Sequence, residues 1–189
     1  VEYTNSTGAI SVVIGDFNGD SKKDVAIATA VSGAGGVSVI IGRGSGVLNA
    51  SMLYTTAGVD PRAVATGDFN KDGHLDLVTA NYQDSTVSVF INNGSGSFAT
   101  PETFSVGLGP TSVAVGDFNH DGLPDIVTSN YLNDTITILI NNGAGFASPT
   151  TISVGTGPES LVVGDFNHDQ YDDIAVANVI SSNITILTN

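Results

Sequence analysis

The chain has 189 residues and a formal net charge of −14, with only five Lys and Arg residues in all. Nucleic acids and anionic membrane surfaces are bound by clustered cations, so neither is a predicted partner. No apolar run approaches the ~20 residues that span a bilayer. The absence of cysteine excludes disulfides, thiol nucleophiles and thiolate metal sites. The apolar residues are rich in Val and Ile, and 23 glycines imply many tight turns. This composition predicts an all-β protein, because β-branched residues fit a pleated sheet.

An acidic motif recurs four times along the chain. Asp16-Phe17-Asn18-Gly19-Asp20 returns in similar form from Asp68, from Asp117 and from Asp165. The repeat is therefore about 50 residues long, and a period of that length with several strands in each unit is typical of propeller blades.

The third unit illustrates the strands that each repeat predicts. Residues 111–115 are short, apolar and β-branched and predict a first strand, and residues 126–130 predict a second strand after the acidic loop. Residues 135–140 alternate strictly, which indicates a third strand with one buried face. Asn141-Asn142-Gly143 is a hairpin turn signal, and residues 146–154 predict a fourth, outer strand.

The repeats together predict a β-propeller of four four-stranded antiparallel blades. The expected boundaries are 9–58, 59–108, 109–156, and 157–189 combined with 1–8. The last unit stops after its third strand, and the opening residues resemble the end of a fourth strand. We therefore expect the N-terminal strand to complete the last blade and close the ring, which would remove the free edges. Two alternatives are a fragment of a larger propeller trimmed at strand boundaries and a homodimer that shares the strand to make eight blades.

The acidic loops have the spacing Asp-x-Asn-x-Asp-x-x-x-Asp, with oxygen ligands at positions 1, 3, 5 and 9 and a backbone carbonyl at position 7. Hard oxygen ligands in this number suit Ca²⁺, whereas Mg²⁺ usually keeps several waters and zinc and copper favour His or Cys. The sequence therefore predicts four calcium ions, one in each blade. The predicted ligands are Asp16, Asn18, Asp20, Lys22 and Asp24; Asp68, Asn70, Asp72, His74 and Asp76; Asp117, Asn119, Asp121, Leu123 and Asp125; and Asp165, Asn167, Asp169, Tyr171 and Asp173.

Position 6 of such a loop requires a left-handed backbone, which glycine adopts at little cost. Gly73 and Gly122 occupy this position in the second and third loops, but Ser21 and Gln170 occupy it in the first and fourth. The sequence therefore predicts weaker binding in the first and fourth loops, with the extra charge of Asp172 partly offsetting the loss in the fourth.

Two other kinds of side chain accompany the loops. The histidines lie at positions whose side chains are not expected to face a metal, so they are predicted to be surface residues. A phenylalanine follows the first Asp of every loop and is predicted to pack between neighbouring blades. These residues are His74, His120 and His168, and Phe17, Phe69, Phe118 and Phe166.

The motif Val-x-x-Gly-Asp-Phe-Asn-x-Asp-Gly-x-x-Asp-Ile is met in full from Val113 to Ile126, and the second unit matches it nearly as well. In this motif, and over almost its whole length, the chain resembles the FG-GAP or VCBS repeats of integrin-like β-propellers. The resemblance implies four-stranded blades with calcium in the loop between the first two strands. It also implies a role in adhesion, surface recognition or carbohydrate binding, or an accessory position beside a secreted enzyme. Members usually have more than four blades.

The leading functional prediction is an extracellular or cell-surface recognition or adhesion module, with a glycan or a protein surface as its ligand. The face opposite the metal loops carries turns in which Tyr82, Asp84, Tyr131 and Asp134 suit stacking on a sugar and binding its hydroxyl groups. The competing interpretation of these residues is ordinary turn chemistry with the tyrosines half-buried.

Two other functions compete with recognition as interpretations of the sequence. One is a purely structural, calcium-stabilised scaffold within a larger secreted or surface protein, and the other is an accessory part of a secreted hydrolase. Enzymatic activity is not predicted, because the calcium loops account for most of the acidic residues and no catalytic set is distinct from the repeats. The sequence is compatible with both a monomer and a strand-sharing homodimer. The N-glycosylation sequons agree with an extracellular location; they begin at Asn5, Asn49, Asn93, Asn133 and Asn183.

Overall fold

The computed structural model describes residues 8–31, 34–44, 47–49, 52–55 and 58–189. All regular secondary structure in this described part is β-strand, and the strands form four antiparallel sheets. The all-β prediction and the propeller-like arrangement of blades are therefore confirmed. No helix among the described residues is long and apolar enough to cross a membrane.

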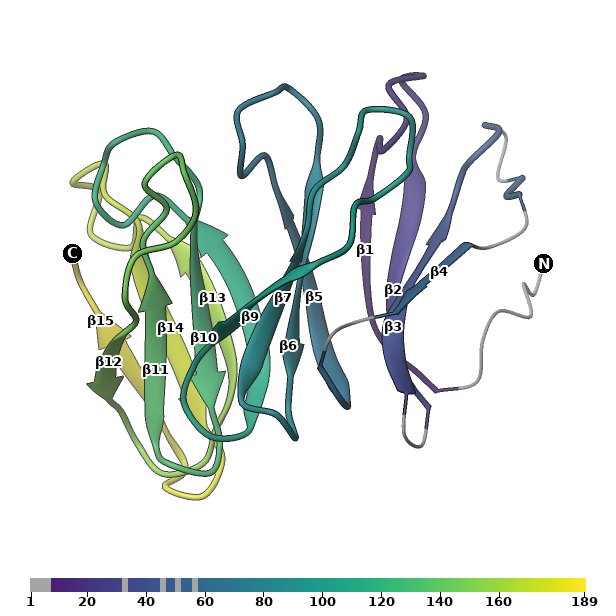
Figure 1. The fold of residues 1–189 in the computed structure, drawn as a ribbon. Coiled ribbons are helices and arrows are strands. Elements are labelled where there is room, and N and C mark those ends of the chain that lie inside the picture. The colour runs from purple at the N-terminus through teal and green to yellow at the C-terminus, as the bar shows by residue number, and fades with distance from the viewer. Residues whose placement is uncertain (1–7, 32–33, 45–46, 50–51, 56–57) are drawn as a thin grey trace.

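Each sheet follows the chain from an inner first strand outward (Figure 1). Blade 1 contains β1 (Ala9–Gly15), β2 (Asp24–Val31), β3 (Ala34–Ile40) and β4 (Met52–Thr55). Blade 2 contains β5 (Pro61–Gly67), β6 (Asp76–Asn81), β7 (Thr86–Phe90) and β8 (Glu102–Ser105). Blade 3 contains β9 (Pro110–Gly116), β10 (Asp125–Asn130), β11 (Thr135–Leu139) and β12 (Thr150–Ser153). Blade 4 contains β13 (Pro158–Gly164), β14 (Asp173–Asn178) and β15 (Asn183–Leu187).

The strands lie where alternation and turn residues predicted them. A proline begins the first strand of blades 2, 3 and 4, where its missing N–H is tolerated. The predicted hairpin turn after β11 is also present, because Asn141 and Phe146 form a bridge that encloses it. The fourth strand of blade 3 is shorter than predicted and spans only Thr150–Ser153. It pairs on one side only, with β11.

The hydrophobic core is divided into clusters that lie between successive blades. In the first cluster, Phe17 and Val37 of blade 1 pack with Leu77 and Phe90 of blade 2. The same arrangement joins blade 2 to blade 3 and blade 3 to blade 4. The phenylalanine after the first Asp of each loop therefore packs between blades in the first three units, as predicted.

A side-chain amide strengthens each of these contacts, and it is buried at the first two. The side-chain Nδ2 of Asn92 donates to the backbone carbonyl of Phe17 at 2.8 Å, which joins the end of β7 to the acidic loop of blade 1. Asn141 donates in the same way to Phe69 at 2.8 Å. Asn189 repeats the contact with the carbonyl of Phe118. We call these three side chains the interblade asparagines.

The four sheets form an open row with blade 1 and blade 4 at opposite ends (Figure 1). The strand predicted to complete blade 4 falls on residues 1–8, of which residues 1–7 lie outside the described part. The carbonyl of Gly8 accepts a hydrogen bond from the Ala30 N–H of β2, so this residue continues blade 1. Blade 4 has three described strands.

Candidate metal sites in the acidic loops

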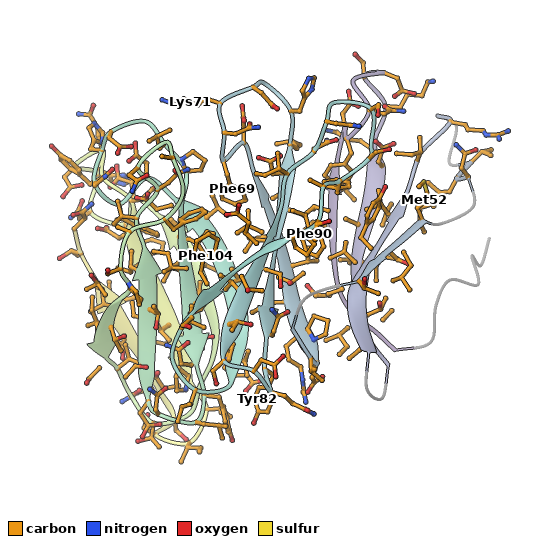
Figure 2. All side chains as sticks on the ribbon, viewed as in Figure 1. Met52, Phe69, Lys71, Tyr82, Phe90 and Phe104 are labelled. Carbon is orange, nitrogen blue, oxygen red and sulfur yellow. The ribbon has the colours of Figure 1, made fainter. Side chains whose placement is uncertain are left out.

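The four acidic loops connect the first and second strands of each blade and share one edge of the molecule. Lys71, in the second loop, lies at one end of blade 2, and Tyr82, in the turn after β6, lies at the other end (Figure 2). The loop edge and the turn edge are therefore opposite, as the strand order requires.

The first Asp of each loop accepts hydrogen bonds from the loop's own backbone. In the third loop, Asp117 Oδ1 accepts from the Asp121 N–H at 3.0 Å, and Oδ2 accepts from the Gly122 N–H at 2.7 Å. Asn119 Oδ1 accepts from the Asp121 N–H at 3.1 Å, and Asp121 Oδ1 accepts from the Leu123 N–H at 2.8 Å. The equivalent bonds occur in the other three loops. These bonds curl the loop so that positions 1, 3 and 5 share one short turn.

The Asp at position 9 has a role that the metal motif did not predict. Asp125 is fully buried, and its two carboxylate oxygens accept from the Phe118 N–H and the Asn141 N–H, both at 2.8 Å. The other three loops repeat this pair of bonds. The carboxylate therefore ties the start of the acidic loop to the end of the third strand.

Burial has an electrostatic consequence at this position. Desolvation raises the pKa of Asp76 to about 6, against hydrogen bonds from Asn92 and Phe69 that lower it. The negative charges of Asp72 and Asp68 raise it further. The pKa of Asp125 is raised for the same reasons, with desolvation the largest cause. In the second and third loops, neighbouring carboxylates thus repel the buried one, and a bound cation would relieve this repulsion.

The chemical type of the available ligands suits a calcium ion. The side chains at positions 1, 3 and 5 and the carbonyl at position 7 are all oxygen donors, and a carboxylate oxygen that accepts one hydrogen bond keeps a free lone pair. Within the described residues, however, no three acidic or histidine side chains are gathered into a group that could hold a metal. The side chains that would hold calcium would therefore have to move together when it binds.

The backbone of the loops is left-handed at two positions. Position 6 has φ of 64° at Ser21 and 75° at Gln170, so both adopt the predicted conformation without being glycine. Position 4 is left-handed as well, and only the first loop has a glycine there, Gly19. The fourth loop is therefore the only one of the four with a side chain at both left-handed positions, His168 and Gln170.

All three histidines were predicted to be surface residues, and the prediction holds for two of them. His120 and His168 are exposed, whereas His74 is half-buried. The ring of His120 lies 4.7 Å from that of Tyr171 in the next loop, measured between centroids. A side chain at position 4 can therefore reach the neighbouring blade's loop.

On the turn edge, Tyr82 and Tyr131 are both half-buried. The guanidinium of Arg62 lies over the Tyr82 ring, 4.7 Å from its centroid, and also binds the carboxylate of Asp60 at 2.9 Å. One face of the Tyr82 ring is therefore already covered by a cation.

The acids of the turn edge accept hydrogen bonds from neighbouring backbone. Asp84 Oδ2 accepts from the Val59 N–H at 2.6 Å, and Asp134 Oδ1 accepts from the Gly157 N–H at 2.9 Å. The residue of blade 3 that matches Asp84 is Asn133, whose Oδ1 accepts from the Leu108 N–H at 3.2 Å. Ordinary turn chemistry thus accounts for the polar residues that the sequence singled out here.

A cavity of about 320 Å³ between the outer parts of blades 2 and 3 was not predicted. Its wall includes Phe104 and Phe146, whose rings pack edge to face with centroids 5.0 Å apart, and the carboxylate of Glu102. The sequence shows only an aromatic residue in each of two outer segments, and this pattern does not indicate a cavity.

An FG-GAP-like repeat model matches residues 16–79 and 68–128, and an FG-GAP repeat model matches residues 109–148. No curated protein matches the chain.

Solved structures match the fold at low identity. A Bacteroides uniformis protein described as a candidate 6-phosphogluconolactonase is 19% identical with a TM-score of 0.70, over 97% of this chain and 55% of that one. A functionally unknown protein from Desulfotomaculum acetoxidans is 13% identical with a TM-score of 0.66, over 98% of this chain and 57% of that one. The V. cholerae biofilm matrix protein Bap1 is 16% identical with a TM-score of 0.52, over 93% of this chain and 30% of that one. The chain spans less than two thirds of each of these proteins. With the repeat models covering most of its length, the chain belongs to the FG-GAP-like repeat family.

Proposed function

We propose that the chain is a calcium-stabilised propeller module of an extracellular or surface protein and that it serves recognition or adhesion rather than catalysis. The observation that carries the proposal is the recurrence of one loop geometry in four blades, each time with oxygen donors at positions 1, 3 and 5. FG-GAP repeats are typical of extracellular or surface proteins, which agrees with the location proposed.

The charge of the loops supports a cation over a polar turn without one. Each loop brings at least three aspartates into nine residues, and the raised pKa of Asp76 reflects both burial and the repulsion from Asp72 and Asp68. A bound Ca²⁺ would remove this repulsion. Binding to the folded state alone would stabilise it by mass action, and extracellular calcium modules have dissociation constants of about 10⁻⁴–10⁻³ M.

Three acids outside the loops support a role other than catalysis. Asp60 is paired with Arg62, and Asp84 and Asp134 accept backbone hydrogen bonds in turns. Glycosidase chemistry needs two carboxyl groups that face one substrate, and these three are engaged with their own turns.

The test of calcium binding compares Asp121→Asn with Asp134→Asn. Asparagine retains the Oδ1 that accepts from the Leu123 N–H, so Asp121→Asn removes a metal-binding charge while keeping the hydrogen bond. The unmodified chain and Asp134→Asn should melt several degrees higher in millimolar Ca²⁺ than in a chelator, with a smaller rise for Asp121→Asn. Isothermal titration should find four sites in the unmodified chain and a weakened third site in Asp121→Asn. An identical melting temperature of the unmodified chain in calcium and chelator would overturn the proposal.

A glycan is the ligand class that we propose for the turn edge, on the strength of Tyr131 and its neighbouring amides. Tyr131→Ala should abolish binding on a glycan array while leaving the melting temperature within about 2 °C of the unmodified value. Tyr82→Ala is the matched variant. Its ring is covered by Arg62, so the loss of binding should be smaller.

A purely structural role is the second candidate. It is favoured by the hydrogen bonds that Asp84 and Asp134 accept from backbone N–H groups, which give both side chains a structural role. A glycan array and a protein-surface screen that are both blank, with calcium binding intact, would select it.

A further inference from the structure

At each end of the row of blades, one apolar sheet face is not covered by any other described blade. We call the outward face of blade 1 the leading face and the outward face of blade 4 the trailing face. Large apolar side chains are exposed on both. The leading face carries Ile10, Val12, Ile14 and Leu53, and the trailing face carries Val162, Phe166, Ile184 and Ile186.

These residues match positions that are buried elsewhere in the molecule. Val12 is 62% exposed, whereas Val64, at the same place in blade 2, is 5% exposed because blade 1 covers it. Ile184 is 68% exposed, whereas Ile136, at the same place in blade 3, is fully buried against blade 4. The two faces are thus the unused halves of a contact that the chain already makes three times.

Phe166 shows the same contrast. Phe17 and Phe69 are wedged between blades and nearly or fully buried, but Phe166 is 46% exposed because no described blade follows it. Contiguous exposed apolar surface of this kind marks a contact with another protein surface. The surface that fits the trailing face is a leading face of the same repeat type.

The charges at the two ends are complementary. The residue before the buried Asp faces the preceding blade's loop, as Asp172 does when it accepts from the Asp117 N–H at 2.9 Å. In blade 1 this residue is Lys23, which is exposed. A trailing face placed before it would bring Lys23 to the fourth acidic loop, which begins at Asp165. Residues 157–189 contain five acidic residues and no Lys or Arg.

We propose that the leading face of one copy of this chain packs on the trailing face of a second copy, head to tail. Two copies would make both contacts at once and close a ring with the four sheets of each copy. The resulting ring has about eight blades, within the range that propellers adopt. A head-to-tail contact must either close in this way or continue as a filament. The contact is between sheet faces and is independent of any shared strand and of the proposed ligand.

One part of the internal contact is missing between copies. The residue that matches the interblade asparagines in blade 1 is Gly42, and a Cβ there would lie 2.1 Å from the carbonyl oxygen of Lys23. No side chain can therefore reach the carbonyl of Phe166 from this position. Apolar burial and the charge of Lys23 are left to hold the copies together, so the contact between copies should be weaker than those within the chain.

The first experiment is the molar mass of the full 189-residue chain by light scattering over a dilution series, in calcium. Twice the single-chain mass of 19.2 kDa is expected at the higher concentrations. Ile14→Glu, on the leading face, and Ile186→Glu, on the trailing face, should each reduce the mass to one chain. Leu132→Glu is the control, because Leu132 is exposed in a turn and lies on neither face. A single-chain mass for the unmodified protein at every concentration would overturn the proposal.

Mixing the two variants tests the head-to-tail geometry itself. A dimer of Ile14→Glu with Ile186→Glu has one contact with both substitutions and one with neither, so mixing should restore a dimer that neither variant forms alone. If one variant alone still dimerises, the contact joins two like faces, and the proposal is wrong. Far-UV circular dichroism and a melting curve confirm that each variant is folded, which is expected because both side chains are more than half exposed.

A charge reversal distinguishes this specific contact from non-specific hydrophobic association. Lys23→Glu should raise the dimer dissociation constant severalfold at low salt, and the difference should shrink at high ionic strength. Lys71→Glu is the matched control, since Lys71 lies in the second loop, away from both end faces. Equal effects of the two reversals would contradict the placement of Lys23 at the contact.

Discussion

A single missing hydroxyl distinguishes blade 4 from blades 2 and 3. In blades 2 and 3 the hydroxyls of Thr79 and Thr128 donate to the buried amide oxygens of Asn81 and Asn130, at 3.0 and 2.9 Å. In blade 4 the matching residue is Val176, and Asn178 Oδ1 is buried with no hydrogen-bond partner among the described residues. Leaving such an acceptor unsatisfied costs roughly 1–3 kcal/mol.

Val176→Thr should therefore stabilise the fold. The two side chains have nearly the same shape, and the new hydroxyl would satisfy Asn178 Oδ1 at the cost of some apolar burial. We expect a net gain of about 1 kcal/mol, or about 2–4 °C in melting temperature for a chain of this size. Thr128→Val is the mirror experiment, which should destabilise blade 3 by orphaning Asn130. A lower melting temperature for Val176→Thr would show that the acceptor is already satisfied in solution.

The fourth acidic loop should be improved by a glycine. Gln170 has φ of 75°, and a left-handed conformation costs a residue with a side chain roughly 1–2 kcal/mol. Gln170→Gly should relieve part of this strain and tighten calcium binding in the fourth loop by several-fold. Gly122→Gln, in the third loop, should do the reverse. Titration calorimetry of both variants checks the pair, and equal affinities would contradict the argument.

At the scale of elements, the interblade asparagines join the end of one blade's third strand to the preceding blade's acidic loop. Asn141 Nδ2 donates to the carbonyls of Phe69 and Pro124, at 2.8 and 3.2 Å. Its Oδ1 accepts from the Gly143 N–H at 3.0 Å. One side chain thus holds a turn in shape and connects two blades.

Asn141→Ala should destabilise the chain by about 1–3 kcal/mol, because it leaves buried carbonyls without a donor. Asn142→Ala is the matched control. Asn142 is the next residue in the same turn, but its side chain is exposed and accepts only a local bond from the Ala144 N–H at 3.0 Å. Urea unfolding of both variants provides the comparison. A loss for Asn142→Ala as large as that for Asn141→Ala would assign the effect to the turn rather than to the interblade bond.

The sequence predicted the inner strands of each blade well and the loop conformation only in part. Strict alternation over residues 135–140 located β11, since one face of an antiparallel strand must be buried. The left-handed position 4 was missed because Lys71 and His120 give no sign of it, whereas Gly73 marked position 6 plainly.

Residues with two roles were also predicted only in part. Asn141 was assigned to a turn, and its second bond to blade 2 depends on which blades are adjacent in space. Asp125 was assigned to a metal, and its bonds to two distant N–H groups likewise depend on the folded sheet. Nothing in a local pattern encodes contacts of this range.

For the whole molecule, the row of blades implies a gradient of stability. Blades 2 and 3 are covered on both faces, whereas blades 1 and 4 are each covered on one. Local opening follows the number of buried contacts, so strands at the ends should open more easily than those in the middle.

Hydrogen exchange measured by mass spectrometry should reveal this gradient in the monomeric Ile14→Glu variant. Amides of β6 and β10 should be protected most, and those of β1 and β15 least. In the unmodified dimer the end strands should approach the protection of the central ones, because a second copy covers them. A flat profile in the monomeric variant would mean that the four blades unfold as one unit.

The buried aspartate at the end of each acidic loop also bears on how the motif would persist through descent. Its carboxylate is required by two backbone N–H groups whether or not a cation is bound, and the first aspartate likewise holds its own turn. Selection for folding alone would then retain much of the signature in a descendant that had ceased to bind calcium. Among repeats of this kind, the exposed carboxylates at position 5 therefore indicate metal binding most directly, because they contribute least to the fold.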